Sequence, residues 1–177
     1  SAVSYNMYLI NKFHVHTVYY IPEEALKTHK NKELYKKWVK EGHLKVCGKK
    51  SIDYDMIAND VMEMAKYLCI LQIGYDSYKA IEFTNMLGSL GGAKYLQAFG
   101  QTYGNFTSPV QTFEKCLLDD RLTLNDNPIN AFCFDNAVLD EDRLENKKPI
   151  KRSAAKKIDG VITALMTMGE FNNYVRH

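Results

Sequence analysis

Two aspartates occupy positions where carboxylates often take part in chemistry, at the boundaries of predicted regular elements. Asp76 follows the apolar stretch CILQIGY at 69–75, and Asp159 opens the apolar stretch 158–174. Ligands of open α/β sheets gather at the carboxyl ends of strands, and the N-terminus of a helix favours negative charge. Each acid also has a purely structural interpretation, Asp76 as a helix N-cap and Asp159 as a partner of the helix dipole.

The chemistry that two such acids would support is metal-dependent hydrolysis of a phosphodiester. Two divalent ions about 3.5–4 Å apart, held by converging carboxylates, activate water and stabilise the leaving oxygen. Hard oxygen ligands favour Mg²⁺ or Mn²⁺. Asp76 and Asp159 come from distant parts of the chain. The hypothesis therefore requires the fold to bring both side chains to one pair of ions.

A basic segment directly precedes Asp159. Its six basic residues within eleven positions are Lys147, Lys148, Lys151, Arg152, Lys156 and Lys157. Such a run is most often a solvated loop, but beside a carboxylate site it would bind the DNA backbone and make binding salt-dependent. The polar segment 100–109 is predicted to be a loop, and its Tyr103, Asn105 and Phe106 are candidates for lining the same groove.

The composition is that of one globular domain without a strong overall field. The chain has 177 residues, 46% hydrophobic, with a net charge of +2, so any attraction to nucleic acid must come from local clustering. No run of 18 apolar residues is present, which argues against a membrane span. The widely spaced cysteines Cys47, Cys69, Cys116 and Cys133 favour free thiols in a reducing, intracellular location.

Hydrophobic periodicity and turn residues predict an α/β fold with a mixed sheet. We expect strands at 2–10, 13–21, 43–48, 69–75 and 93–99, and helices at 22–42, 54–68, 78–87, 109 onward, 128–138 and 158–174. Asp53, Ser108 and Asn127 are the predicted helix caps. The 69–75 run is expected to be a central strand covered on both faces. His14 and His16 share one strand face, where a metal pair is an alternative to the commoner half-exposed face.

Five ordered blocks resemble the large terminase subunits of tailed bacteriophages, in the C-terminal nuclease domain. The blocks are KEGHLKVCGKKSIDYDMI, IGYDSYKA, FGQTYGNFTSPVQTFEKCL, NPINAFCFDNAVLD and KKIDGVITALMTMG, within residues 22–169. No G-x-x-x-x-G-K-[ST] phosphate loop, the mark of a packaging ATPase, is present. The whole chain, 1–177, is expected to be a single nuclease domain and a fragment of a longer protein.

The resemblance implies a ribonuclease-H-like fold, with a central mixed β-sheet flanked by helices on both faces, and a two-metal endonuclease using Mg²⁺ or Mn²⁺. Asp76 and Asp159 match the second and third acids of the family's metal site. The first acid lies on a strand upstream of SAVSYN and is absent here. Asp53 and Asp135 are possible extra acids, but neither is expected to be a direct metal ligand. The family's substrate is concatemeric double-stranded viral DNA. The implied partners are the ATPase domain, the small terminase subunit and the portal, without a membrane, in the host bacterial cytoplasm.

Two other classes of function stay open at the sequence level. The absent first acid allows a catalytically impaired module that only binds DNA or docks a packaging partner. The glycines of GSLGG at 88–92 faintly suggest a domain that binds a small phosphorylated ligand. Phosphate-binding glycines precede a helix, however, and these are expected to end one.

Overall fold

A computed structural model describes residues 1–78 and 80–176 of the chain, which forms two compact units. Unit 1 combines Ser1–Tyr19 with the residues from Gln101 onward, and unit 2 is Tyr20–Gly100. Unit 1 contains β1 (Ala2–Leu9), most of β2 (Lys12–Ile21), α5 (Tyr103–Leu118), β6 (Leu122–Leu124), α6 (Pro128–Asp135), β7 (Ala137–Glu141), β8 (Lys147–Lys151) and α7 (Asp159–Tyr174). Unit 2 contains α1 (Ala25–Thr28), α2 (Lys32–Lys40), β3 (Lys45–Val46), α3 (Tyr54–Met64), β4 (Ile73–Asp76), α4 (Ile81–Ser89), the 3₁₀ turn η1 (Ala93–Tyr95) and β5 (Leu96–Phe99).

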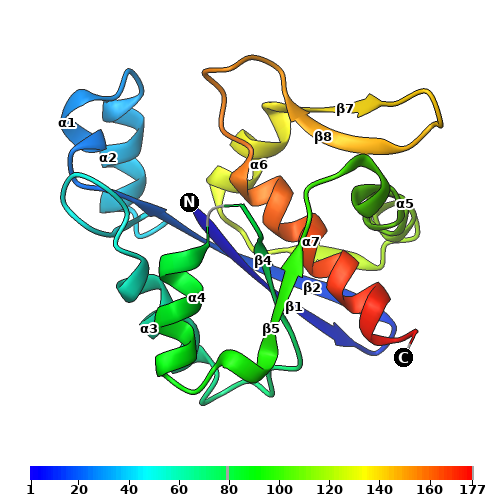
Figure 1. Ribbon diagram of the computed structural model, residues 1–177. Coiled ribbons are helices and arrows are strands. Elements are labelled where there is room, and N and C mark those ends of the chain that lie inside the picture. The colour runs from blue at the N-terminus through cyan, green and yellow to red at the C-terminus, as the bar shows by residue number, and fades with distance from the viewer. Residues whose placement is uncertain (79, 177) are drawn as a thin grey trace. The chain divides into compact units, whose positions relative to one another are not determined.

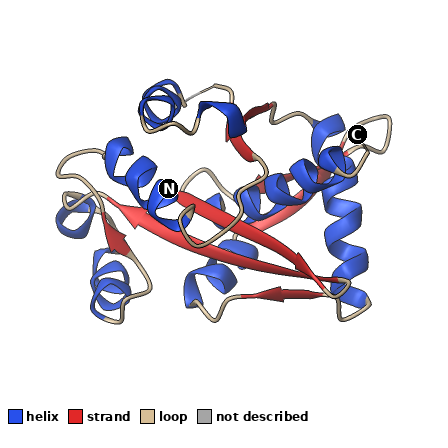
Figure 2. Cartoon of the chain, turned by 90° about the horizontal axis from the view of Figure 1, so that it is seen from below, coloured by secondary structure: helices blue, strands red, loops and turns tan. Residues whose placement is uncertain are grey.

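Unit 1 is built on a hairpin, formed by the two strands predicted at 2–10 and 13–21, and its long strands β1 and β2 pair in antiparallel register (Figure 2). Ile10 and Asn11 form its two-residue turn, both with positive φ, as a type I′ turn requires. Strand β6 adds in parallel to β2. Alternate residues of β2 are buried, which follows from the two-residue period of a strand with one face on the core.

Helix α7 packs along β1 and against α5, as Figure 1 shows within this unit. Small polar side chains make part of the contact. Ser4 Oγ lies 2.8 Å from both Thr17 Oγ1 and Thr163 Oγ1, so β1, β2 and α7 are tied by a hydroxyl chain. Farther along, the rings of Tyr8 and Phe171 pack with centroids 4.9 Å apart.

Helix α5 begins earlier than the sequence suggests. The predicted start at Ser108-Pro109 is wrong, because Thr102 is the N-cap and accepts a hydrogen bond from the Asn105 amide at 3.2 Å. Pro109 lies inside the helix, where it removes one intrahelical donor. Phe106 is fully buried, and burying this ring requires helix over the segment predicted to be a loop. Packing therefore decides between the two cap signals.

The charged segment 140–157 is partly strand rather than solvated loop. Strands β7 and β8 pair in antiparallel register, and the Asp142 carboxylate closes their turn. Asp142 Oδ1 accepts from the amides of Leu144 at 2.8 Å and Asn146 at 2.9 Å. The hydrogen bonds from Asn146 are the main reason that the pKa of Asp142 lies below its usual value. The predicted helix from Pro128 accordingly stops at Asp135, where β7 soon begins.

Unit 2 keeps the predicted order of elements with shorter bounds. The predicted helix at 22–42 is two helices, because His29 is extended and ends α1. Asp53 caps α3 as predicted, accepting from the amides of Asp55 at 3.0 Å and Met56 at 3.1 Å. Gly91, with φ of +86°, follows the end of α4, so the glycine-rich segment ends a helix as expected.

The prediction of a central strand over 69–75 is wrong in extent and burial. Strand β4 begins only at Ile73, while Cys69 and Leu71 are exposed. It pairs in parallel with β5, the one strand neighbour that it has among residues 1–78 and 80–176. An apolar run alone does not distinguish a central strand from an edge, because it carries no information about pairing.

The architecture is mixed α/β, as predicted. In the part of the chain that the structure describes, the strands form three sheets: β1–β2–β3 with β6 on β2, β4–β5, and β7–β8. β2 is antiparallel to β1 and parallel to β3 and β6, so the largest sheet is mixed. Within the same residues, no helix combines the length and apolar character needed to cross a membrane.

Candidate functional site

Asp159 is the first residue of α7, where the sequence places it. Its side chain is 46% exposed, and Oδ2 lies 3.4 Å from the amino nitrogen of Ser1. The carboxylate is therefore accessible. The helix N-terminus adds a favourable field for the ionised form.

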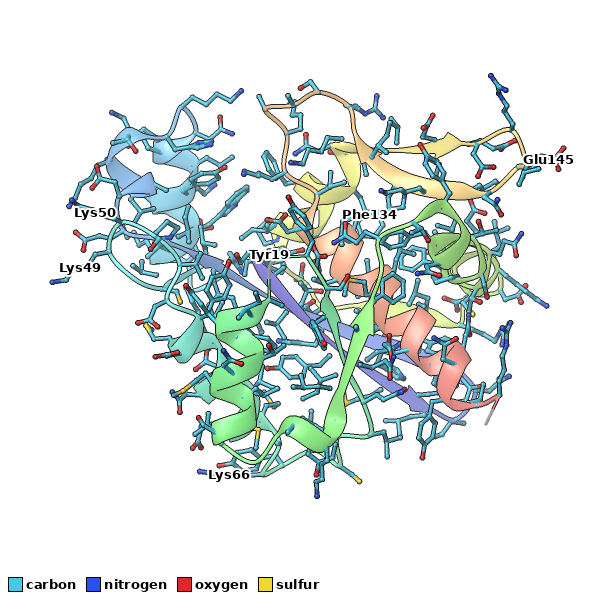
Figure 3. All side chains as sticks on the ribbon, viewed as in Figure 1. Tyr19, Lys49, Lys50, Lys66, Phe134 and Glu145 are labelled. Carbon is cyan, nitrogen blue, oxygen red and sulfur yellow. The ribbon has the colours of Figure 1, made fainter. Side chains whose placement is uncertain are left out.

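The backbone around Asp159 is fixed by buried neighbours. Gly160 packs so closely on Tyr19 that a Cβ at this position would lie 2.0 Å from the phenolic oxygen. Cys133 interacts with both the Gly160 backbone and the Tyr19 side chain. Burial raises the pKa of the Tyr19 phenol and of the Cys133 thiol, so both groups are neutral at physiological pH. Figure 3 labels Tyr19 beside the start of α7.

Tyr19 is the residue of this site that the sequence patterns do not reveal. It lies on β2, 4% exposed, and donates a 2.6 Å hydrogen bond to Asn130 Oδ1. The local signal for it is weak, since a tyrosine in an apolar strand is ordinary core. Gly160 gives no firmer signal, because Gly104 stands at the same place in α5 and a Cβ there meets no heavy atom within 4 Å.

The six basic residues before Asp159 divide into two groups. Lys147 and Lys148 are held by α5: Lys147 Nζ lies 3.9 Å from Glu114, and Lys148 Nζ lies 5.7 Å from the centre of the Tyr103 ring. The other four are exposed and form no ion pair with any described residue. They are Lys151, Arg152, Lys156 and Lys157.

The loop that carries these four residues is anchored at both ends. The Arg152 amide donates to the Asn136 carbonyl at 2.9 Å, and Asn136 Nδ2 donates to the Lys157 carbonyl at 3.2 Å. Asn136 is buried, so the loop is fastened to unit 1 directly before Asp159. The positive charges are thereby kept near this carboxylate by the chain itself.

The other groove candidates, Tyr103, Asn105 and Phe106, all lie in α5, and a groove role for Tyr103 and Asn105 stays a prediction. Tyr103 lies in the first turn of α5, and its hydroxyl donates to Asp140 of β7. Phe106 is fully buried and cannot line a groove, so its prediction is wrong. Asn105 is exposed at the start of α5.

Asp76 is the last residue of β4, at the carboxyl end of a parallel pair. Its Oδ1 accepts from the Tyr78 amide at 3.0 Å, which closes a turn rather than capping α4, since α4 begins at Ile81. Asp76 belongs to unit 2 and Asp159 to unit 1. The predicted meeting of the two carboxylates at shared ions stays a prediction.

The fit of a divalent metal can be judged from the donors. Asp76 and Asp159 each offer a carboxylate at the end of a regular element, and such oxygen ligands suit Mg²⁺ or Mn²⁺. No group of three or more His, Cys, Asp or Glu among residues 1–78 and 80–176 has the arrangement of a metal site. His14 is half-buried and His16 is exposed, as expected of a half-exposed strand face, and His14 Nδ1 lies 2.8 Å from Thr123 Oγ1. Each carboxylate therefore fits a hard divalent ion chemically.

The class of protein follows from the fold together with comparison of the sequence. Residues 3–174 match the family "Terminase large subunit, endonuclease domain", and the chain belongs to this family. The prediction made from the five sequence blocks is confirmed.

The chain is also similar to individual proteins. The chain is 27% identical over 159 residues to the large terminase subunit of Enterobacteria phage HK97, covering 89% of this chain and 32% of that protein. It is 26% identical over 157 residues to Protein YmfN of Escherichia coli K12, covering 86% and 33%. The crystal structure of the HK97 large terminase matches with a TM-score of 0.86 at 25% identity, covering 96% of this chain and 36% of that one. The chain thus spans about a third of the length of these relatives.

Proposed function

We propose that this chain is a metal-dependent DNA endonuclease domain that cuts concatemeric viral DNA during packaging. The observation that carries the proposal is the family match over residues 3–174, combined with Asp159 exposed at the start of α7 behind a basic loop. Asp76 and Asp159 would help to hold two Mg²⁺ or Mn²⁺ ions. When bound, such ions supply activation of water and neutralisation of charge at the scissile phosphate.

The residues of this chain would do the binding and orienting. The exposed Lys151, Arg152, Lys156 and Lys157 would contact backbone phosphates and guide the duplex toward Asp159. Such contacts carry little sequence information, so cleavage would be nearly independent of sequence. Lys147 and Lys148, which are held by α5, would instead support the β7–β8 hairpin.

A complete site would require an acid from an upstream segment. Among the residues that the structure describes, β1 has one strand neighbour, β2. An added strand would extend this sheet toward the ribonuclease-H-like arrangement, with one central sheet between helices. We therefore propose that the chain is the single nuclease domain of a longer terminase subunit.

The partners follow from the same proposal. The chain would act on double-stranded viral DNA together with an ATPase domain, a small terminase subunit and a portal, in the host bacterial cytoplasm. A binding module without cleavage is the second candidate. It is favoured by the four exposed basic residues before Asp159, which can bind phosphates without a metal ion.

Plasmid nicking tests the proposal. The chain, extended by the upstream strand, is incubated with supercoiled plasmid and Mn²⁺, and nicked product is followed with time. Asp76→Asn and Asp159→Asn should each lower the rate by at least 100-fold. Asp126→Asn, which changes an exposed acid between β6 and α6, should cut like the parent.

Two outcomes would contradict it. Equal cutting by the parent and by both site variants would remove the two aspartates from the chemistry. Binding without any cutting by the extended chain would favour the binding module. Replacing the four exposed basic residues with Gln should flatten the salt dependence of DNA binding, by about 0.9 in the slope for each phosphate that is no longer neutralised. Replacing Lys147 and Lys148 is the matched control.

A further inference from the structure

We infer that Tyr19, supported by Asn130 and Cys133, is a positioning residue for Asp159. This inference rests on the proposed role of Asp159 as a metal ligand. Tyr19 would not touch the metal or DNA. It would act through Gly160, by fixing the first turn of α7 and hence the direction of the neighbouring carboxylate.

The tyrosine hydroxyl belongs to a hydrogen-bonded chain that returns to its own strand. Tyr19 donates to Asn130 Oδ1 at 2.6 Å, and Asn130 Nδ2 donates to the Asn125 carbonyl at 2.7 Å. The Asn125 side chain accepts from the Thr17 amide at 2.9 Å and donates to the Thr17 carbonyl at 3.2 Å. The Tyr19 hydroxyl is therefore held by Asn130 of α6, which is held by Asn125 between β6 and α6, and Asn125 is in turn bonded to Thr17 of β2.

The contact with α7 leaves almost no freedom. An ideal Cβ on Gly160 would lie 2.0 Å from the Tyr19 oxygen and 2.8 Å from Cζ, so only glycine allows the helix to approach this closely. Cys133 interacts with the Gly160 backbone from α6. The Asn136 side chain holds the Lys157 carbonyl just before the helix. Asp159 thus lies between two anchored positions, 157 and 160.

Metal ligands tolerate displacements of only about 0.5 Å or 10–20°. Residues that orient ligands typically change metal affinity by about 10–100-fold when replaced. Removing the Tyr19 hydroxyl would leave Asn130 Oδ1 without its donor and give Gly160 room to shift. The expected result is a weaker metal site rather than an unfolded protein.

The test is Tyr19→Phe in the chain extended by the upstream strand, with Mn²⁺ binding measured by isothermal titration calorimetry. The Mn²⁺ Kd should rise by about 10-fold or more. In nicking assays at fixed Mn²⁺, kcat should fall while KM for DNA stays unchanged, because phosphate contacts are not affected.

Tyr20→Phe is the matched control. Tyr20 is the next residue on β2, is 3% exposed, and donates to Asp60 Oδ2 at 3.0 Å. Both variants remove one hydroxyl from a buried ring and should lower thermal stability to a similar degree. Only Tyr19→Phe should weaken Mn²⁺ binding. Equal Mn²⁺ affinity in the two variants, with weakened affinity in Asp159→Asn, would overturn the inference and leave the proposed function standing.

A different result would overturn both. If Asp159→Asn binds Mn²⁺ as tightly as the parent, the Asp159 carboxylate is not a metal ligand, and Tyr19 cannot be a positioning residue for one. If Tyr19→Phe fails to fold, Cys133→Ala is tested in its place. The Cys133→Ala variant keeps the hydrogen bond between Tyr19 and Asn130 and removes the sulfur that interacts with the Gly160 backbone. An unchanged Mn²⁺ Kd in that variant would equally contradict the inference.

Discussion

Replacing Gly160 with Ala tests the packing at the start of α7 directly. The new methyl group would lie 2.0 Å from the Tyr19 oxygen and 2.9 Å from Cε1. Tyr19 cannot move aside freely, because it is 4% exposed and hydrogen-bonded to Asn130. Either the helix start or the tyrosine must shift, and a shift of the tyrosine breaks that hydrogen bond.

The change in the free energy of unfolding follows from two destabilising effects and one stabilising effect. Overpacking a core costs about 1–3 kcal/mol, and a buried acceptor without its donor costs about 1–3 kcal/mol. Alanine gains about 1 kcal/mol at most over glycine from helix propensity. The free energy of unfolding should therefore fall by roughly 1–5 kcal/mol, which lowers Tm by roughly 2–20 °C for a chain of this size.

The assay is urea unfolding followed by circular dichroism, with Gly104→Ala as the matched control. Gly104 is the second residue of α5, as Gly160 is of α7, but a Cβ there meets no heavy atom within 4 Å. Gly104→Ala should be neutral or slightly stabilising. If both variants gain stability alike, helix propensity alone governs Gly160, and the argument from close contact with Tyr19 is refuted.

Three further changes can be measured by the same unfolding assay. Asp53→Ala removes the cap of α3 and should cost about 1 kcal/mol, whereas Asp55→Ala should cost much less. Burial raises the pKa of Glu170 to about 7 from 4.5, so its protonated form stabilises the fold below pH 4.5 and this stabilisation disappears as pH rises through 7. Glu170→Gln should therefore gain stability over the parent between pH 5 and pH 8, and an equal difference at both pH values would contradict this. Ile10→Asn should gain about 1 kcal/mol, because Ile10 is 99% exposed with φ of 48°, a conformation that suits asparagine; a drop in stability would exclude strain at this turn.

Local signals predicted the structure well where local physics decides it. The Asp53 cap and the Asn127-Pro128 start of α6 follow from hydrogen bonding and fixed backbone angles within a few residues. The hairpin at the N-terminus follows from two strands separated by a short turn. The position of Asp159 is also predictable, since an acid at the start of a helix is a local pattern.

The errors arise where distant contacts decide. Thr102 and Ser108 both have cap chemistry, and only the burial of Phe106 selects the first. The apolar run at 69–75 does not reveal that pairing begins at Ile73. The contact of Tyr19 with Gly160 joins β2 to α7 and has no local pattern at all. The sequence therefore indicates the acid at the candidate site but not the residues that hold it.

The discontinuity of unit 1 has a kinetic consequence. Its β1 strand contacts α7 through Ser4 and Thr163, which are 159 positions apart, and through Asn6 and Met168, which are 162 apart. Closing loops of this length carries an entropic cost that grows with the logarithm of their length, and such topologies fold slowly. Unit 2, inserted between Tyr19 and Gln101, can shorten the effective loop once it has formed, because it then holds its own ends at a fixed separation. Refolding should accordingly show formation of the inserted unit before α7 becomes protected from hydrogen exchange.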